Sequence, residues 1–314
     1  MQHPAFERPG RFFRGNLHTH STTSDGALPA GEVCRRYAEA GYDFLCMSDH
    51  FMEPYGYPVT DTRDFRTNRF TTIPGAELHT GAMENGEIWH ILAVGLPGDF
   101  APPEDDGRAN GHGAGDGTNG AASAVAIARR AVEAGAFVAL AHPEWNGLSA
   151  EDARLIDAAH AVEIYNHGCH VDSDRGHGIA LLDMLLSEGR RLSACATDDA
   201  HFRNRDYFGG WVMVKAEANE PEALVAALKA GEYYASTGPE LRELAIDGDS
   251  IIVECSPAER VIAMGARSVS RVVHGPGITR ATLPLEPFRR GGWVRVGIHD
   301  GVGRRAWSNP LWFA

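Results

Sequence analysis

Short apolar runs alternate with helical patterns from residue 15 to about residue 238. The apolar runs predict seven strands, at residues 15–20, 42–48, 71–78, 88–94, 137–141, 161–165 and 191–196. The segments between and after them predict helices over residues 29–40, 121–134, 179–188 and 220–230. Such alternation is typical of successive β-α units, so the sequence predicts an α/β protein with a parallel sheet or barrel.

Two segments depart from this alternation. Residues 97–120 are rich in Gly, Asp, Asn and Pro, which predicts a mobile loop. After residue 238 the pattern changes to short β-type runs separated by turn residues, such as 244–246, 251–255, 261–264 and 293–298. Because 314 residues exceed the usual size of one domain, we expect a large domain over residues 1–238 and a small β-sandwich-like domain over residues 239–314.

The composition excludes several classes of protein. A formal charge of −13 without a basic run argues against binding to duplex nucleic acid. No apolar run approaches the roughly 20 residues of a membrane span, and the N-terminus carries no secretion signal, which predicts a cytoplasmic protein without membrane contact. The five cysteines never form a C-x-x-C pair, which argues against a disulfide framework or a zinc ribbon and predicts buried thiols.

A His-x-His pair, His18 and His20, lies in the first predicted strand. Side chains alternate between the two faces of a strand, so both imidazoles would point at one metal ion. An isolated pair of this kind is equally consistent with histidines that only hydrogen-bond to carboxylates or water. This pair is not isolated, because Asp25 and the dipeptide Asp49-His50 follow it.

Further candidate ligands lie at or just after the ends of predicted strands, where the functional residues of α/β barrels gather. The full set is His18, His20, Asp25, His50, Glu77, His90, His142, Asp199 and His201. Nine N and O donors without a thiolate fit two or three divalent ions such as Zn²⁺, Mn²⁺ or Fe²⁺, each with an open position. Taken singly, His90 or His142 is more often a core histidine, but the joint set predicts a catalytic metal centre.

The chain resembles the PHP (polymerase and histidinol phosphatase) superfamily over roughly residues 12–238. The resemblance rests on an ordered series of strings: Leu17-His18-Thr19-His20-Ser21 with Asp25-Gly26, Ser48-Asp49-His50, Gly75-Ala76-Glu77, His90, Ala141-His142-Pro143 and Asp199-Ala200-His201. It implies a distorted seven-stranded (β/α) TIM-like barrel that holds a di- or trinuclear metal centre and hydrolyses phosphate esters. The segment beginning Gly238-Pro239-Glu240-Leu241 resembles the accessory β domain of a subgroup that includes carbaryl-hydrolase-type enzymes.

The resemblance also implies how the ligands are shared among the ions. The implied sets are His18, His20, Glu77 and Asp199 for one ion, Glu77, His90 and His142 for a second, and Asp25, His50 and His201 for a third. Glu77 would bridge the first two ions, and some members of the superfamily carry His where this chain has Asp25. Asp198 is an alternative ligand, although the D-x-H spacing to His201 favours Asp199. Asp49 is expected to orient a ligand rather than to bind metal.

Glu77 and Asp199 are thus predicted at the catalytic centre, where two ions sharing a water would make a bridging hydroxide available and neutralise charge on the substrate. Arg203 and Arg205 are candidates for a bidentate phosphate clamp, with surface solvation as the alternative for each. His170 is a candidate general acid for the leaving group, with a solvated loop as the alternative. Three further residues adjoin metal motifs and are candidates for lining the pocket: His79, Trp145 and Asn146.

Three functions remain open on the sequence. The first is a metal-dependent phosphoesterase acting on a small phosphorylated metabolite or nucleotide. The second is a carbamate, ester or amide hydrolase using the same centre, for which replacing Arg203 or Arg205 would barely change turnover. The third is a non-catalytic metal-stabilised module, whose mark would be missing ligands, and none is missing here. A serine triad is disfavoured because no G-x-S-x-G string occurs, and the sequence specifies no oligomeric state.

Overall fold

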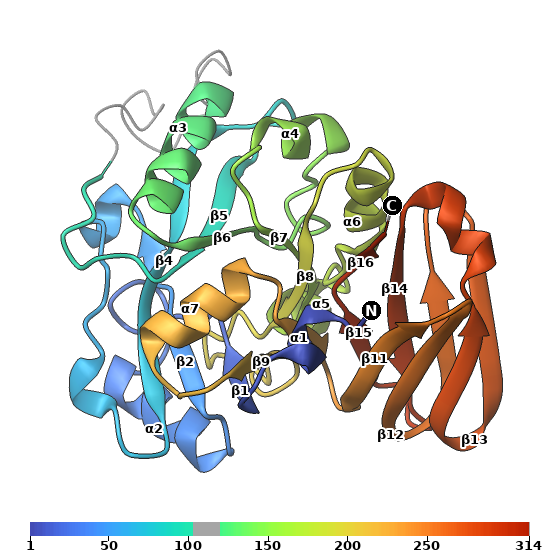
Figure 1. Cartoon of the computed structure of the whole chain (residues 1–314). Helices are drawn as coiled ribbons and strands as arrows, with labels where there is room; N and C mark the ends of the chain where they lie inside the picture. Colours follow the sequence, from blue (N-terminus) through green and yellow to red (C-terminus); the bar gives the residue numbers. More distant parts are fainter. Residues whose placement is uncertain (103–119, 314) are drawn as a thin grey trace.

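A computed structural model describes residues 1–102 and 120–313, and its strands form one large mixed sheet (Figure 1). The loop predicted at residues 97–120 lies mostly outside the described residues. The first ten strands are β1 (Arg11–Asn16), β2 (Phe44–Met47), β3 (His50–Phe51), β4 (Thr71–Ala82), β5 (Ile88–Val94), β6 (Phe137–Leu140), β7 (Ala161–Asn166), β8 (Ser193–Thr197), β9 (Trp211–Ala216) and β10 (Tyr233–Ser236). The helices are α1 (Pro4–Glu7), α2 (Ala30–Glu39), α3 (Gly120–Glu133), α4 (Ala150–Leu155), α5 (His167–Ser173), α6 (Ile179–Ser187) and α7 (Pro221–Lys229).

The sheet is not the closed seven-stranded barrel that the resemblance implied. Its strand order is β11-β12-β14-β15-β10-β9-β1-β2-β4-β5-β6-β7-β8, so β8 lies at a free end. β8 cannot pair with β1 to close the sheet, because β2 and β9 already occupy both edges of β1. A single bridge between Thr19 and Ala200 links the segments that follow β1 and β8.

The sequence pattern had suggested a parallel sheet, but the sheet contains both parallel and antiparallel pairs. β4 and β5 are joined by only five residues, and a connection that short joins antiparallel strands. β5 with β6, β1 with β9 and β9 with β10 are antiparallel as well, whereas β1-β2, β2-β4, β6-β7 and β7-β8 are parallel.

The sheet nevertheless curves around a shared apolar core. Phe44 on β2, Ile73 on β4, Phe137 on β6 and Cys195 on β8 belong to one buried cluster, together with Leu224 on α7. Burial of such side chains is the main stabilising contribution to the fold, at about 1.5–3 kcal/mol for each large one. The curved sheet thereby gathers the ends of its strands around one site.

The described C-terminal segment is all-β apart from one 3₁₀ helix, η3 (Glu286–Gly291). Its strands are β11 (Leu241–Asp247), β12 (Ser250–Met264), β13 (Ser270–Pro284), β14 (Trp293–His299), β15 (Arg305–Ser308) and β16 (Leu311–Trp312). β11 to β14 stand to one side in Figure 1, and β15 pairs with β10, so one sheet runs through both parts of the chain. The buried Arg295 of β14 also donates two hydrogen bonds to Asp183 of α6, at 2.7 and 2.6 Å.

All seven strands predicted before residue 200 are present, with shifted ends. The first strand ends at Asn16, so His18 and His20 lie just beyond it rather than on it. The runs at 251–255 and 261–264 belong to the single long strand β12, whose pairing with β13 shifts register between them. All five cysteines are free and buried, as predicted. Within the described residues, no helix is long and apolar enough to cross a membrane.

Candidate metal centre

The predicted ligands come from seven segments that meet at one end of the curved sheet. His18 and His20 follow β1, Asp25 lies in the next turn, and His50 is on β3. Glu77 and His90 lie on β4 and β5, His142 follows β6, and both Asp199 and His201 follow β8. His90 reaches this end from near the start of its strand, because β5 runs antiparallel to β4 and His90 pairs with His79.

Glu77 lies between two groups of donors and is 1% exposed. Its Oε2 is 3.5 Å from His18 Nε2 and 3.6 Å from His20 Nε2. Asp199 Oδ1 completes this group, at 3.3 Å from His18 Nε2 and 3.0 Å from His20 Nε2. The other oxygen, Oε1, is 2.7 Å from His90 Nδ1 and 2.9 Å from His142 Nε2. One carboxylate therefore faces both groups.

A third group lies beside the first. Asp25 Oδ1 is 3.2 Å from His50 Nε2 and 3.3 Å from His201 Nε2. The ring of His20 stacks on the ring of His201 at 4.2 Å, which makes this group continuous with the first. Ligand atoms from His20, Asp25, His50 and His201 all lie within 4.8 Å of one another.

The donor atoms of the first group have the separations that a metal ion requires. Donors bound to one tetrahedral ion at about 2.0–2.1 Å lie about 3.3 Å apart, and the four distances in the Glu77 Oε2 group run from 3.0 to 3.6 Å. Three buried donor atoms, His18 Nε2, Glu77 Oε2 and Asp25 Oδ1, have no hydrogen-bond partner. A buried polar atom without a partner is costly, and cations bound in the first and third groups would satisfy these atoms.

The electrostatics favour a charged carboxylate at Glu77. Burial alone would raise its pKa, but four neighbouring histidines hold the pKa of Glu77 well below its usual value. Burial likewise opposes charge on His18, but three neighbouring carboxylates raise the pKa of His18 well above its usual value. The group is thus a buried set of opposite charges in which cations can replace protons.

Two candidate ligands sit in an unfavourable backbone conformation. His142 has φ 23° and Asp199 has φ 55°, both in the left-handed region that non-glycine residues seldom adopt. Such conformations persist where the surrounding structure holds them, and they gather at functional sites. Each residue lies two positions after the end of a strand, His142 after β6 and Asp199 after β8, so the turn aims each side chain at the cluster.

A buried carboxylate that was not predicted from the sequence, that of Glu163, holds two of the candidate ligands in place. Glu163 on β7 accepts hydrogen bonds from His18 Nδ1 at 3.0 Å and from the backbone N–H of His142 at 2.6 Å. It also accepts from the Thr197 hydroxyl, and Asn166 Nδ2 donates to both Glu163 and Asp199, at 3.0 and 3.1 Å. A register shift between Glu163 and Tyr165 lets side chains three residues apart face the same site. The sequence signal that could have identified Glu163 is a single acidic residue inside an otherwise apolar strand.

Three neighbouring residues lie differently from expectation. Asp49 accepts hydrogen bonds from Ser21, Ser24 and Thr60 and thus fixes the loop after His20, rather than orienting a ligand side chain directly. Burial raises the pKa of Asp198 to about 6, and its carboxylate accepts from the Tyr37 hydroxyl and three backbone N–H groups, at residues 208–210. His79 joins the cluster, with its Nε2 2.8 Å from His50 Nδ1.

A cavity of about 300 Å³ opens beside the first and third groups. Its lining residues are Asp25, Trp145, Gly168, Cys169, Asp172, Asp199, His201, Arg203, Asn204 and Asp206. Arg203 donates to the backbone carbonyl of Asp25, and its guanidinium is 3.6 Å from the Asp25 carboxylate. Arg205 is exposed and does not line this cavity.

The other predicted pocket residues lie apart from this cavity. His170 is on α5, where a loop was one of the two expectations, and its ring packs 5.6 Å from that of Tyr165. Asn146 is buried, and its backbone carbonyl accepts from Asn85. Neither lines the cavity, so the general-acid role of His170 stays a prediction.

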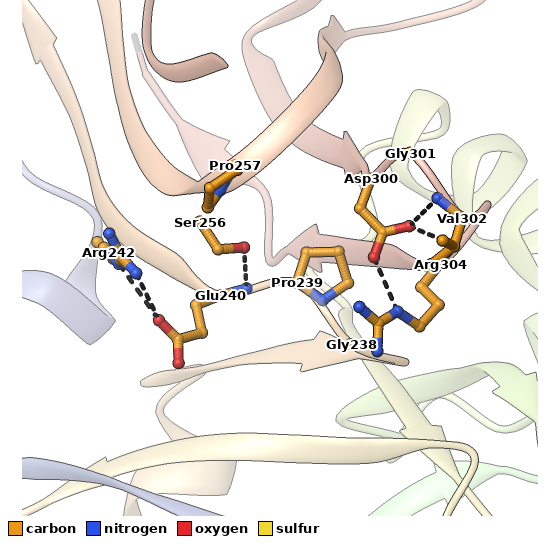
Figure 2. A pocket seen from close by; sticks show the side chains of 10 residues that line it. All are labelled: Gly238, Pro239, Glu240, Arg242, Ser256, Pro257, Asp300, Gly301, Val302 and Arg304. Carbon is orange, nitrogen blue, oxygen red and sulfur yellow. Dashed lines mark hydrogen bonds and ion pairs between the residues drawn. The ribbon is translucent and has the colours of Figure 1, made fainter. Parts of the chain in front are cut away.

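A separate cavity of about 440 Å³ lies between β11 and the turn before β15 (Figure 2). Its charged side chains pair with one another, Arg242 with Glu240 at 3.0 Å and Arg304 with Asp300 at 2.8 Å. Its lining contains no histidine or cysteine. This surface offers no chemistry comparable with the Glu77 cluster.

Comparison with known proteins yields structural neighbours. No protein-family model and no curated protein sequence matches the chain. Among solved structures, the chain is similar to a two-domain protein containing a predicted PHP-like metal-dependent phosphoesterase from Bacteroides vulgatus ATCC 8482. The identity is 15%, the TM-score is 0.51, and the match covers 98% of each chain. A weaker likeness is to an amidohydrolase from Chromobacterium violaceum with bound SO4 and no metal, at 15% identity and a TM-score of 0.41 over 61% of this chain and 89% of that one.

The neighbour from Bacteroides vulgatus is matched along almost its whole length, including the C-terminal β part. At 15% identity this match speaks to the fold and not to the substrate. The narrower resemblance to carbaryl-hydrolase-type enzymes stays a prediction. The chain therefore has the fold of a two-domain PHP-like protein, which confirms at the level of the fold the resemblance carried by its motifs.

Proposed function

We propose that this chain is a metal-dependent hydrolase, and that it acts as a phosphoesterase on a small phosphorylated metabolite or nucleotide. The observation that carries the proposal is the position of Glu77, whose two oxygens face two separate groups of histidine and aspartate donors. Structural zinc sites usually close their shell with cysteine, whereas N and O donors beside an open cavity are typical of catalytic ions.

His18, His20, Glu77 and Asp199 would hold one divalent ion. Glu77, His90 and His142 would hold a second, and Asp25, His50 and His201 a third with His20 close by. When bound, such ions supply an activated water and neutralise charge on the substrate oxygens. Zn²⁺, Mn²⁺ and Fe²⁺ all suit this donor set.

The chain's own residues would hold these groups in place and admit the substrate. Glu163 keeps the His18 ring oriented through Nδ1, so Nε2 faces Glu77 and Asp199. Arg203 lines the cavity, where a guanidinium can bind two oxygens of a phosphoryl group. The cavity of about 300 Å³ suits a small molecule rather than a folded polymer.

One observation keeps hydrolysis of a carbamate, ester or amide as the second candidate. Four aspartates and a single arginine line the cavity, so its charged side chains alone do not favour an anion. Bound divalent ions would offset those carboxylates, and a phosphate ester depends on that offset more than a neutral carbonyl substrate does.

The test is a hydrolysis panel on protein reconstituted with Mn²⁺ or Zn²⁺, covering phosphate monoesters, phosphodiesters, aryl esters and carbamates. Turnover of phosphate esters that disappears on chelation and returns with metal is the expected result. Turnover restricted to the carbonyl substrates would replace the first candidate with the second. No metal-dependent turnover of any substrate would count against both.

The same panel on arginine variants tests the role of the guanidinium. Arg203→Ala should raise KM for phosphate esters by about tenfold. A charge-assisted hydrogen bond contributes about 1.5–3 kcal/mol, and the lower value is expected here because the Arg203 side chain is partly exposed. Arg242→Ala is a matched control, because Arg242 is also exposed and paired but lies in the C-terminal part. Arg205→Ala tests whether one arginine or both bind the substrate, because it should raise KM only if Arg205 also contacts the phosphate. An unchanged KM for Arg203→Ala would remove Arg203 from the substrate site.

A further inference from the structure

Trp145 is the most exposed of the six tryptophans, with 41% of its surface accessible. A ring of this size offers a large apolar area to any molecule that covers it. Trp145 lies on the turn that follows β6, where its backbone N–H donates to the carbonyl of His142 at 3.0 Å. The ring is therefore tied to a candidate metal ligand rather than to a distant surface loop.

Two imidazoles hold the indole beside the cluster. The ring of His142 lies 5.1 Å from that of Trp145, and the ring of His90 lies 5.6 Å away, both at steep interplanar angles of 77° and 69°. His90 and His142 form the group around Glu77 Oε1. The indole thus borders the second proposed ion position and also lines the cavity of about 300 Å³.

Most of the other residues that line that cavity are polar. Arg203 stands beside Asp25, and Asn204 donates to Asp172 at 3.0 Å. Asp199 and His201 lie in the same lining. A molecule in the cavity therefore meets an aromatic ring, candidate ligands, and charged or amide side chains.

We infer that Trp145 forms a subsite for a planar ring, so that the preferred substrates are aryl or heteroaryl esters whose leaving group stacks on the indole. This inference rests on the proposed hydrolase function, and it holds for phosphate and for carbonyl substrates alike. Stacking of a ring on an exposed tryptophan strengthens binding by about tenfold, and offset or edge-on contact with the indole suffices.

The test measures binding rather than turnover, on metal-reconstituted protein by calorimetry. One pair of probes is phenylphosphonate and methylphosphonate, which carry the same charged group and are not hydrolysed. A second, uncharged pair is N-phenylurea and N-methylurea. We expect the phenyl member of at least one pair to bind about tenfold more tightly, a preference that Trp145→Phe keeps and Trp145→Ala abolishes. Metal content measured on each variant shows that the cluster is intact.

Equal binding of the two members in both pairs, or no binding by any probe, overturns the ring subsite. A phenyl preference that Trp145→Ala retains overturns it as well, because the ring then binds elsewhere. The proposed function fails separately, when the hydrolysis panel shows no metal-dependent turnover. Tight and equal binding of both phosphonates would therefore leave a phosphoesterase standing without a ring subsite.

Discussion

Glu77→Gln is expected to remove metal from two of the three proposed positions and to lower hydrolysis by at least about 1,000-fold. Both carboxylate oxygens of Glu77 face candidate ligands, so the amide loses the negative charge and presents an NH₂ donor to one of the two groups. Bound ions contribute several kcal/mol to stabilising a transition state, and each 1.36 kcal/mol is tenfold in rate. Metal content by elemental analysis and kcat on the best panel substrate check the prediction.

Glu133→Gln is the matched control, because Glu133 is exposed at the end of α3 and belongs to none of the donor groups. Its metal content and turnover should equal those of the wild type. Circular dichroism of Glu77→Gln shows whether the fold is kept, since the substitution is buried but nearly isosteric. Full metal content together with normal turnover in Glu77→Gln would refute the bridging assignment.

Glu163→Gln should weaken metal binding by about 10- to 100-fold without lowering the stoichiometry at saturation. Glu163 touches no proposed ion position, but it orients His18 through Nδ1 and fixes the backbone of His142. Changes to such supporting partners typically cost this much in metal affinity. An amide can accept at only one of its two ends, so Glu163→Gln loses the pair of hydrogen bonds at one oxygen, either those from His18 and Thr197 or those from His142 and Asn166. Titration against a chelator of known affinity measures the change.

Thr197→Val gives a graded comparison, because it removes a single donor to Glu163 and leaves the carboxylate in place. Its loss of metal affinity should be smaller than that of Glu163→Gln. Wild-type affinity in Glu163→Gln would show that the His18 orientation does not depend on this carboxylate. Loss of stoichiometry at saturating metal would instead make Glu163 a ligand itself.

Much of the fold was predictable because strand and helix patterns are local. Pro29 before α2 and Gly41 after it delimit that helix in the sequence as they do in the structure. The closure of the sheet was not predictable, since it depends on which strand takes the second edge of β1, and Trp211–Ala216 was not recognised as a strand at all. Its alternating burial, with Val212 and Val214 inward, leaves only a weak apolar run.

The candidate site was more predictable than the topology, because its residues are rare types in ordered motifs. His18, Glu77 and His142 were all named from the sequence, and the structure brings their side chains together. Glu163 was missed because a single acid in a strand carries no motif, and its role appears only when β7 lies beside β6 and β8. Arg203 and Arg205 are equivalent in sequence, and only the turn after β8 determines that Arg203 lines the cavity and Arg205 does not.

The most direct test of the metal centre is anomalous diffraction at the zinc absorption edge from crystals of Zn²⁺-reconstituted protein. We expect one peak among His18, His20, Glu77 Oε2 and Asp199, and a second among Glu77 Oε1, His90 and His142. A third peak would lie among Asp25, His50 and His201. Peaks only at other positions, or no peak at saturating Zn²⁺, would show that these residues do not form the proposed metal centre.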